Sequence, residues 1–237
     1  MRASQIVASM GAFRQQNRIS NLIANNISNA QTPGFKKDVP LFESLLTDSF
    51  SRFQTSPLDG TRTLFQQGGI QKSGNPLDVA IEGGGFFKVK TPVGTRYTRA
   101  GNFVLNKEGV LTNPDGFPIL GKDGEITLRG QNVSVETDGT VQVDGEARGR
   151  IALATFPDLN TLKKEGHTLF SAEFPETETE ASDFILHQGS LESSNVNSIE
   201  EMANYIDALR SFESCLKIIQ SQDEMDSRAV NELGVLR

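Results

Sequence analysis

Apolar residues recur at helical spacing near the start of the chain. Residues 3–30 contain one Gly and no Pro. Ile6, Met10 and Phe13 fall on one helical face, and Ile23 and Ile27 continue an apolar stripe beyond a polar middle. The spacing predicts an N-terminal helix. Its apolar stripe is thin, so the helix would be weak alone in water, because most helical stability comes from packing.

A second helical pattern runs from residue 197 to residue 234. Ser198 followed by Glu201 matches a capping box, and Gly234 stands where a helix terminator is expected. A helix of about 36 residues would be about 54 Å long, which favours a coiled coil over an ordinary globular helix. The predicted apolar stripe, with spacings of three and four, consists of Ile199, Met202, Ile206, Leu209, Phe212, Leu216 and Ile219.

The segment between the two helical patterns has a different periodicity. Short stretches of alternating polarity are separated by turn signals such as "KEG", "PDG" and "TDG". This pattern predicts an antiparallel β domain, sandwich or barrel-like. The predicted fold class is therefore α+β, with long N- and C-terminal helices forming a coiled-coil-like core domain and an all-β domain inserted between them. The predicted parts are 1–40 for the N-terminal helix and a turn, 41–75 for a connector, 76–190 for the β domain, and 191–237 for the C-terminal helix.

Charge is distributed unevenly along the 237 residues. The whole chain has a formal net charge of -7, which argues against a nucleic-acid partner. Residues 1–40 carry five basic residues against one acidic residue, whereas residues 191–237 carry nine acidic residues against four basic ones. Opposite charge favours pairing of the N-terminal helix with the C-terminal helix over pairing of like helices.

Candidate chemistry is sparse. The two histidines, His167 and His187, lack metal-motif spacing. The Gly-rich stretch at 82–88 does not match a phosphate-binding loop, and we expect it to lead Phe86 and Phe87 into a strand. No catalytic, cofactor-binding or metal-binding residue is predicted, and nothing in the sequence favours an enzyme.

Two kinds of membrane-targeting segment are not expected from the sequence. No run of 18 apolar residues is present, so no transmembrane helix is expected. The N-terminal stretch lacks the continuous apolar region of a secretory signal peptide. We therefore expect a protein that is either cytosolic or exported without cleavage.

The stretch "ANNISNAQTPGFKK", residues 24–37, falls where the first helix should end. Asn tolerates the left-handed conformation, Pro33 blocks continuation of the helix, and Gly34 permits a tight turn. These residues predict a helix C-terminus followed by a turn. They do not explain why three Asn side chains stand together.

Three segments resemble the family of flagellar axial rod and hook proteins. In the first, residues 25–36, three Asn, a Thr and a Gly-Phe-Lys stand at the family's spacing, although Ser28 replaces the usual Ala. The second, residues 75–121, is similar to the family's central-domain signature. The third, residues 189–213, is similar to its C-terminal entry segment. The segments occur in the family's order and cover both ends and the middle of the chain.

The resemblance implies a structural subunit of the bacterial flagellar basal-body rod, which polymerises helically into the drive shaft from motor to hook. The length of the chain is similar to that of the proximal and distal rod proteins of this family, and its C-terminal sequence is more similar to the proximal type. The implied partners are copies of the chain, other rod and hook axial proteins, the export apparatus and the rod cap, without direct membrane insertion. The implied location is the periplasm-spanning rod of the basal body, reached without a cleaved signal peptide. An alternative is an oligomeric coiled-coil adaptor whose β domain recognises a ligand.

The resemblance also gives residues 24–37 a role as an assembly joint that is buried only in the polymer. The amides would satisfy backbone groups of neighbouring subunits, because an amide both donates and accepts. Phe35 would fill an apolar pocket, and Lys36 and Lys37 would face the acidic C-terminal helices. The predicted interface residues are Asn25, Asn26, Asn29, Thr32, Gly34, Phe35, Lys36, Asn195, Val196, Ile199, Met202, Ile206, Leu209, Phe212, Leu216 and Ile219.

Overall fold

The computed structural model describes residues 2–41, 60–130 and 132–234, and the chain divides into two compact units. The described residues of the helical unit are 2–28, 38–41, 60–62 and 197–234. The β unit consists of 29–37 and 63–196, apart from position 131. This division differs from the predicted parts at both junctions, because the turn after the first helix and the residues just before the second helix group with the β unit.

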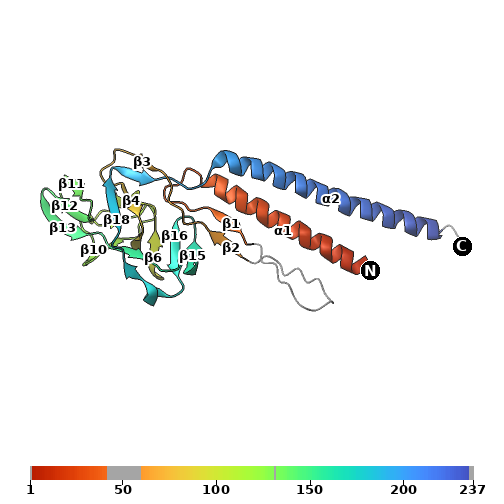
Figure 1. Ribbon diagram of the computed structural model, residues 1–237, viewed down its shortest axis with the longest axis horizontal. Helices are drawn as coiled ribbons and strands as arrows, with labels where there is room; N and C mark the ends of the chain where they lie inside the picture. Colours follow the sequence, from red (N-terminus) through yellow and green to blue (C-terminus); the bar gives the residue numbers. More distant parts are fainter. Residues whose placement is uncertain (1, 42–59, 131, 235–237) are drawn as a thin grey trace. The chain divides into compact units, whose positions relative to one another are not determined.

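The helical unit is a hairpin of two helices, α1 (Arg2–Ser28) and α2 (Ser198–Gly234), which lie side by side (Figure 1). The rings of Phe13 and Phe212 lie 5.0 Å apart, and Gln16 Nε2 donates to the backbone oxygen of Ala208 at 2.7 Å. Rising numbers on α1 meet falling numbers on α2, so the helices are antiparallel. The pairing of the N-terminal with the C-terminal helix that charge predicts is present within one chain. Strand β1 (Asp38–Pro40) pairs with β2 (Thr61–Thr63) in a two-stranded sheet.

The start of α2 differs from the predicted capping box. The helix begins at Ser198, and the residue before it, Asn197, is the cap. Asn197 Oδ1 accepts hydrogen bonds from the backbone amides two and three residues later, at 3.2 and 3.4 Å. The Glu201 carboxylate instead lies against α1, where it accepts a hydrogen bond from Asn26 Nδ2 at 3.4 Å. The predicted box was wrong because its glutamate bonds across to the other helix.

The prediction of a coiled-coil-like core formed by the terminal helices was also wrong. The protein is mainly β, and in the described part of the chain the helices form this two-helix hairpin instead. α2 turns Glu201, Ala208 and Phe212 toward α1. Ile199 and Ile206 each precede one of these residues by two positions, which places them about 200° around the helix. They are 80% and 51% exposed. The first part of the stripe predicted to form a core therefore faces away from α1, whereas Phe212 of the same stripe packs against α1.

The β unit is built from antiparallel strand pairs, as the alternating pattern predicts. Its largest sheet runs in the order β10-β9-β5-β6-β16-β15, with β14 pairing β5 and β17. Smaller sheets pair β11-β12-β13, β18-β4, β19-β3 and β7-β8. The strands of its first half are β3 (Ile70–Lys72), β4 (Val79–Gly83), β5 (Phe86–Thr91), β6 (Gly94–Thr98), β7 (Val104–Leu105), β8 (Leu111–Thr112), β9 (Ile119–Gly121) and β10 (Gly124–Glu125). Those of the second half are β11 (Val133–Val135), β12 (Thr140–Val143), β13 (Glu146–Arg150), β14 (Leu153–Thr155), β15 (Leu162–Glu165), β16 (Leu169–Ala172), β17 (Thr179–Glu180), β18 (Phe184–Gln188) and β19 (Ser190–Glu192), with short 3-10 helices at Leu159–Thr161 and Pro175–Thr177.

The β unit contains two hydrophobic clusters on opposite sides of β5. Successive side chains of a strand point to opposite faces. Phe87 therefore packs in one cluster, edge-on to Phe103 at 4.9 Å, whereas Phe86 packs in the other, 6.0 Å from Phe170. The Gly-rich stretch before them leads into this strand, as predicted, with Gly83 and Gly85 at positive φ.

Candidate assembly site

The turn that follows α1 occupies residues 29–37, which we call the signature turn. Thr32 N donates to the Asn29 backbone oxygen at 3.1 Å, and Phe35 N donates to that of Thr32 at 3.2 Å. Gly34 has a φ of 67°, and a Cβ atom there would lie 2.3 Å from the backbone nitrogen of Ala100. Only glycine fits both the conformation and the space. The predicted turn is therefore confirmed, and it is packed backbone against backbone.

Asn26 is a buried clamp within the helical unit. Its Nδ2 donates to the backbone oxygen of Asp38 at 2.8 Å, and its Oδ1 accepts from Asp38 N at 3.1 Å. Glu201 is the third partner. Asn26 is fully buried, whereas the neighbouring Asn25 is exposed. One of the clustered amides therefore fixes the chain where it returns from the signature turn.

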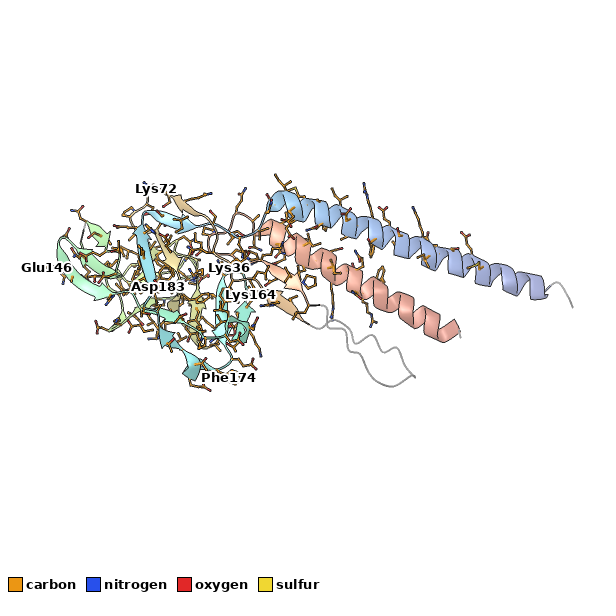
Figure 2. All side chains as sticks on the ribbon, viewed as in Figure 1. Lys36, Lys72, Glu146, Lys164, Phe174 and Asp183 are labelled. Carbon is orange, nitrogen blue, oxygen red and sulfur yellow. The ribbon has the colours of Figure 1, made fainter. Side chains whose placement is uncertain are left out.

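Phe35 is fully buried in the β unit. Lys164, from β15, holds its Nζ 3.9 Å from the centre of the Phe35 ring and donates to the backbone oxygen of Lys36 at 2.6 Å. Figure 2 labels Lys36 and Lys164 close to each other. The arrangement adds a cation–π contact to the burial that was predicted for Phe35.

Lys36 belongs to a buried three-charge cluster with Glu192 and Arg99. Its Nζ donates to Glu192 Oε1 at 2.5 Å and to the backbone oxygen of Gln66 at 2.8 Å. Arg99 Nη1 lies 3.4 Å from Glu192 Oε2. Burial lowers the pKa of Lys36, and the neighbouring carboxylate opposes that shift. Burial likewise lowers the pKa of Arg99.

This cluster corrects two expectations about the signature turn. Lys36 does not face the acidic C-terminal helix, because its carboxylate partner lies on β19 in the β unit. The turn is also not buried only in a polymer, since Phe35 and Lys36 have no exposed surface within the single chain. A buried lysine needs a nearby counter-charge, and the fold supplies one from the same subunit.

Asn195 fixes the other side of the turn. Its Oδ1 accepts from Lys37 N at 2.7 Å, and its Nδ2 donates to the backbone oxygens of Leu64 and Gln66 at 2.8 and 3.2 Å. Val196 beside it is half-buried. The structure thus brings Asn195 together with the signature turn, which the sequence could not show.

The predicted residues on α2 are placed differently from those of the turn. Ile199, Met202, Ile206 and Leu209 are 80%, 53%, 51% and 39% exposed. We call these four residues the α2 stripe. Further along the helix, Phe212 and Leu216 are half-buried, and the side chain of Ile219 lies outside the described residues.

One edge of the signature turn remains open to the surface. Asn29, Thr32 and Pro33 line a cleft of about 420 Å³ in the β unit. Asn29 is buried, whereas Thr32 and Pro33 are half-buried. The opposite wall comes from residues 113–115 and 165–169. The outer rim of the turn is therefore accessible, while its Phe-Lys end is not.

Within residues 2–41, 60–130 and 132–234, no group of three or more His, Cys, Asp or Glu side chains is placed to hold a metal ion. Across the same residues, no helix combines the length and the apolar character needed to cross a membrane.

Comparison with known proteins places this geometry in a family context. Residues 80–143 match the family model "Flagellar hook protein FlgE/F/G D1 domain", and residues 187–232 match "Flagellar basal body rod FlgEFG protein C-terminal". The flagellar basal-body rod protein FlgF of Caulobacter vibrioides is 36% identical over 95% of this chain and 96% of its own length. FlgG of Bacillus subtilis is 32% identical over 89% and 92%, and FlgF of Mesorhizobium japonicum is 30% identical over 99% of both chains. The relatives carry both names, FlgF and FlgG, so these comparisons do not decide between the two.

Proposed function

From the premise that this chain belongs to the family of flagellar basal-body rod proteins, we propose that its signature turn and its α2 stripe divide the task of assembly. The protein is a structural subunit of the rod, located in the flagellar basal body, where rod proteins assemble with other axial proteins. The Phe-Lys end of the turn secures the subunit internally. The α2 stripe contacts neighbouring subunits.

The α2 stripe is the observation that carries this proposal. Four large apolar side chains lie along one helical face and are between 39% and 80% exposed. Burying an exposed Ile, Leu or Met side chain gains on the order of 1 kcal/mol or more. A contiguous apolar face of this kind is typical of a surface that another protein covers. A helix from a neighbouring axial subunit would remove the four side chains from water together.

The remaining roles follow from the family and rest on the same proposal. Repetition of a contact that joins different surfaces of successive subunits builds a helical polymer. In this proposal the polymer transmits torque from motor to hook, the subunits pass through the flagellar export apparatus, and they join the rod beneath its cap. The accessible rim of the signature turn, at Thr32 and Pro33, offers a second contact surface. The proposed function includes no catalytic step.

A double substitution on the stripe tests the proposal. Met202→Ser with Ile206→Ser removes two apolar groups from the uncovered face, so the purified subunit should melt as the wild type does. Cells carrying it should make few hook–basal bodies and lose motility. Asn204→Ser is the matched control, because Asn204 is an exposed polar residue on the same helix. Normal motility of the double variant would contradict the role of the stripe. A purified wild-type chain that forms a discrete closed trimer would favour the adaptor alternative.

A further inference from the structure

Glu192 contacts three other stretches of the β unit. It ends β19 and is 1% exposed. Its Oε1 accepts from Lys36 Nζ at 2.5 Å and from Gly68 N at 2.9 Å, and Arg99 Nη1 lies 3.4 Å from its Oε2. Its backbone oxygen accepts from Gly34 N at 2.8 Å. A residue near the end of the unit thus holds the turn with which the unit begins.

The backbone around Glu192 is packed without spare room. A Cβ atom on Gly68 would lie 1.9 Å from the backbone oxygen of Ser193, and one on Gly34 would lie 2.3 Å from Ala100 N. Such contacts require the segments to be positioned together, because backbone atoms cannot move aside as a flexible side chain can. The signature turn and the end of β19 therefore have one mutually compatible arrangement.

The buried charges of Lys36 and Arg99 allow this packing only when the Glu192 carboxylate is present. Lys36 and Arg99 are both buried, and Glu192 is the acid that both contact. Arg99 Nη2 has a second partner in the Gly83 backbone oxygen at 2.8 Å. Within the described residues, Arg99 Nε is buried without a hydrogen-bond partner. Without the carboxylate, two buried cations would lie together with no counter-charge, a strongly unfavourable state.

We propose that Glu192 makes burial of the signature turn depend on correct placement of the last strand of the β unit. The signature turn takes its buried position only together with the pairing of β19 and β3, because that pairing delivers the carboxylate and the backbone oxygen that the turn needs. The first and the last segments of the unit then become ordered in one step. In a subunit whose strand β19 is not paired with β3, the signature turn cannot take its buried position.

The order of events can be measured by pulse-labelling hydrogen exchange during refolding of the full chain. The Gly34 amide reports the turn, because it donates to Glu192. The Ser193 amide reports β19, because it donates to the Gly69 backbone oxygen at 2.8 Å beside β3. The two amides should become protected in the same kinetic phase. Protection of Gly34 in an earlier phase than Ser193 would overturn the proposal.

A charge-removing variant supplies an equilibrium test. Glu192→Gln keeps the size of the side chain but removes its charge, so exchange at the Gly34 amide should rise at least tenfold. Glu82→Gln is the control, because Glu82 is exposed and pairs with His187 at the surface. Unchanged exchange at Gly34 in Glu192→Gln would refute the proposal.

A double-variant cycle tests the charge pairing itself, while the refolding experiment on the unaltered chain covers the outcome in which Glu192 variants do not fold. Lys36→Met and Glu192→Leu should each lower the melting temperature substantially. Combined, they should lower it by less than the sum of the two shifts, since Lys36→Met removes one of the two buried cations that Glu192→Leu leaves without a counter-charge. Strictly additive shifts would show that Glu192 does not act through the charge of Lys36, and the proposal would fail.

Discussion

Gly34→Ala should destabilise the β unit more than an alanine at another left-handed glycine. Gly34 has a φ of 67°, and Gly74 has a φ of 79°. Both substitutions therefore force alanine into the left-handed region, at a cost of about 1–2 kcal/mol. The two sites differ in space. A Cβ on Gly34 would lie 2.3 Å from Ala100 N and 2.4 Å from Arg99 C, whereas one on Gly74 would meet nothing within 4 Å.

The difference between the two variants isolates the contact made by the signature turn. Overpacking of this kind costs about 1–3 kcal/mol, and more where the opposing atoms belong to the backbone. We take about 2 kcal/mol beyond the Gly74→Ala control. In a chain of this length that corresponds to an additional fall of about 4–8 °C in the melting temperature.

The assay is thermal unfolding of the purified full chain followed by near-ultraviolet circular dichroism, which reports the packed Phe and Tyr rings of the β unit. Gly74→Ala sets the cost of the backbone conformation alone. Melting temperatures of the two variants within about 1 °C of each other would refute the reasoning, since 1 °C corresponds to well under 1 kcal/mol. The turn would then not be pressed against Ala100.

Three further substitutions test other parts of the account. Burial and a hydrogen bond to a carboxylate raise the pKa of Tyr97 above its usual value of 10.0, so the unfolded state loses this proton first and the free energy of unfolding should fall as pH rises past 10. Tyr97→Phe should reduce that fall, measured by urea titrations at pH 8 and pH 10.5. An equal fall in the wild type and the variant would contradict the assignment. Phe35→Ala should cost about 3–5 kcal/mol in chemical denaturation, whereas Phe174→Ala, at a ring that is 48% exposed, should change the midpoint little; equal losses would argue against the buried anchor. Asn26→Ala should cost about 1–3 kcal/mol and speed amide exchange near the end of α1, because buried partners are left unsatisfied, and a similar result for the exposed Asn25→Ala would count against the clamp.

Local pattern predicted the elements better than it predicted their surroundings. The turn at Pro33 and Gly34 depends on the backbone conformation of two adjacent residues, so sequence alone identified it. Alternation along β5 likewise predicted a strand after the glycines. That Phe86 and Phe87 would serve two different clusters depends on what packs on each face, and strand periodicity specifies the faces but not their neighbours.

The charge cluster could not be predicted because its members are far apart in sequence. Lys36 and Glu192 are 156 positions apart, and a lysine after Gly-Phe carries no local sign of burial. Glu192 lay inside a segment that resembled the family, yet a glutamate in a short strand usually faces solvent. The burial of both residues follows from the close approach of the strands and the turn, which only the folded chain defines.

The helices show the opposite error. Spacing correctly placed Ile199, Met202, Ile206 and Leu209 on one face, but the pattern could not say whether that face is covered. α2 carries a second face, with Ala208 and Phe212 among its residues, and Gln16 and Phe13 of α1 lie against that one. The prediction of a core is therefore wrong for the α2 stripe, which is an uncovered surface of the single chain, although Phe212 further along the helix does pack against α1.

Cryo-electron microscopy of isolated basal bodies tests the central claim most directly. The account predicts that a helix of a neighbouring axial subunit covers the α2 stripe, while Lys36 remains paired with Glu192 of its own chain. A map in which the stripe stays exposed to solvent, or in which Lys36 contacts a carboxylate of a neighbouring subunit, would contradict the division between an internal turn and an external stripe.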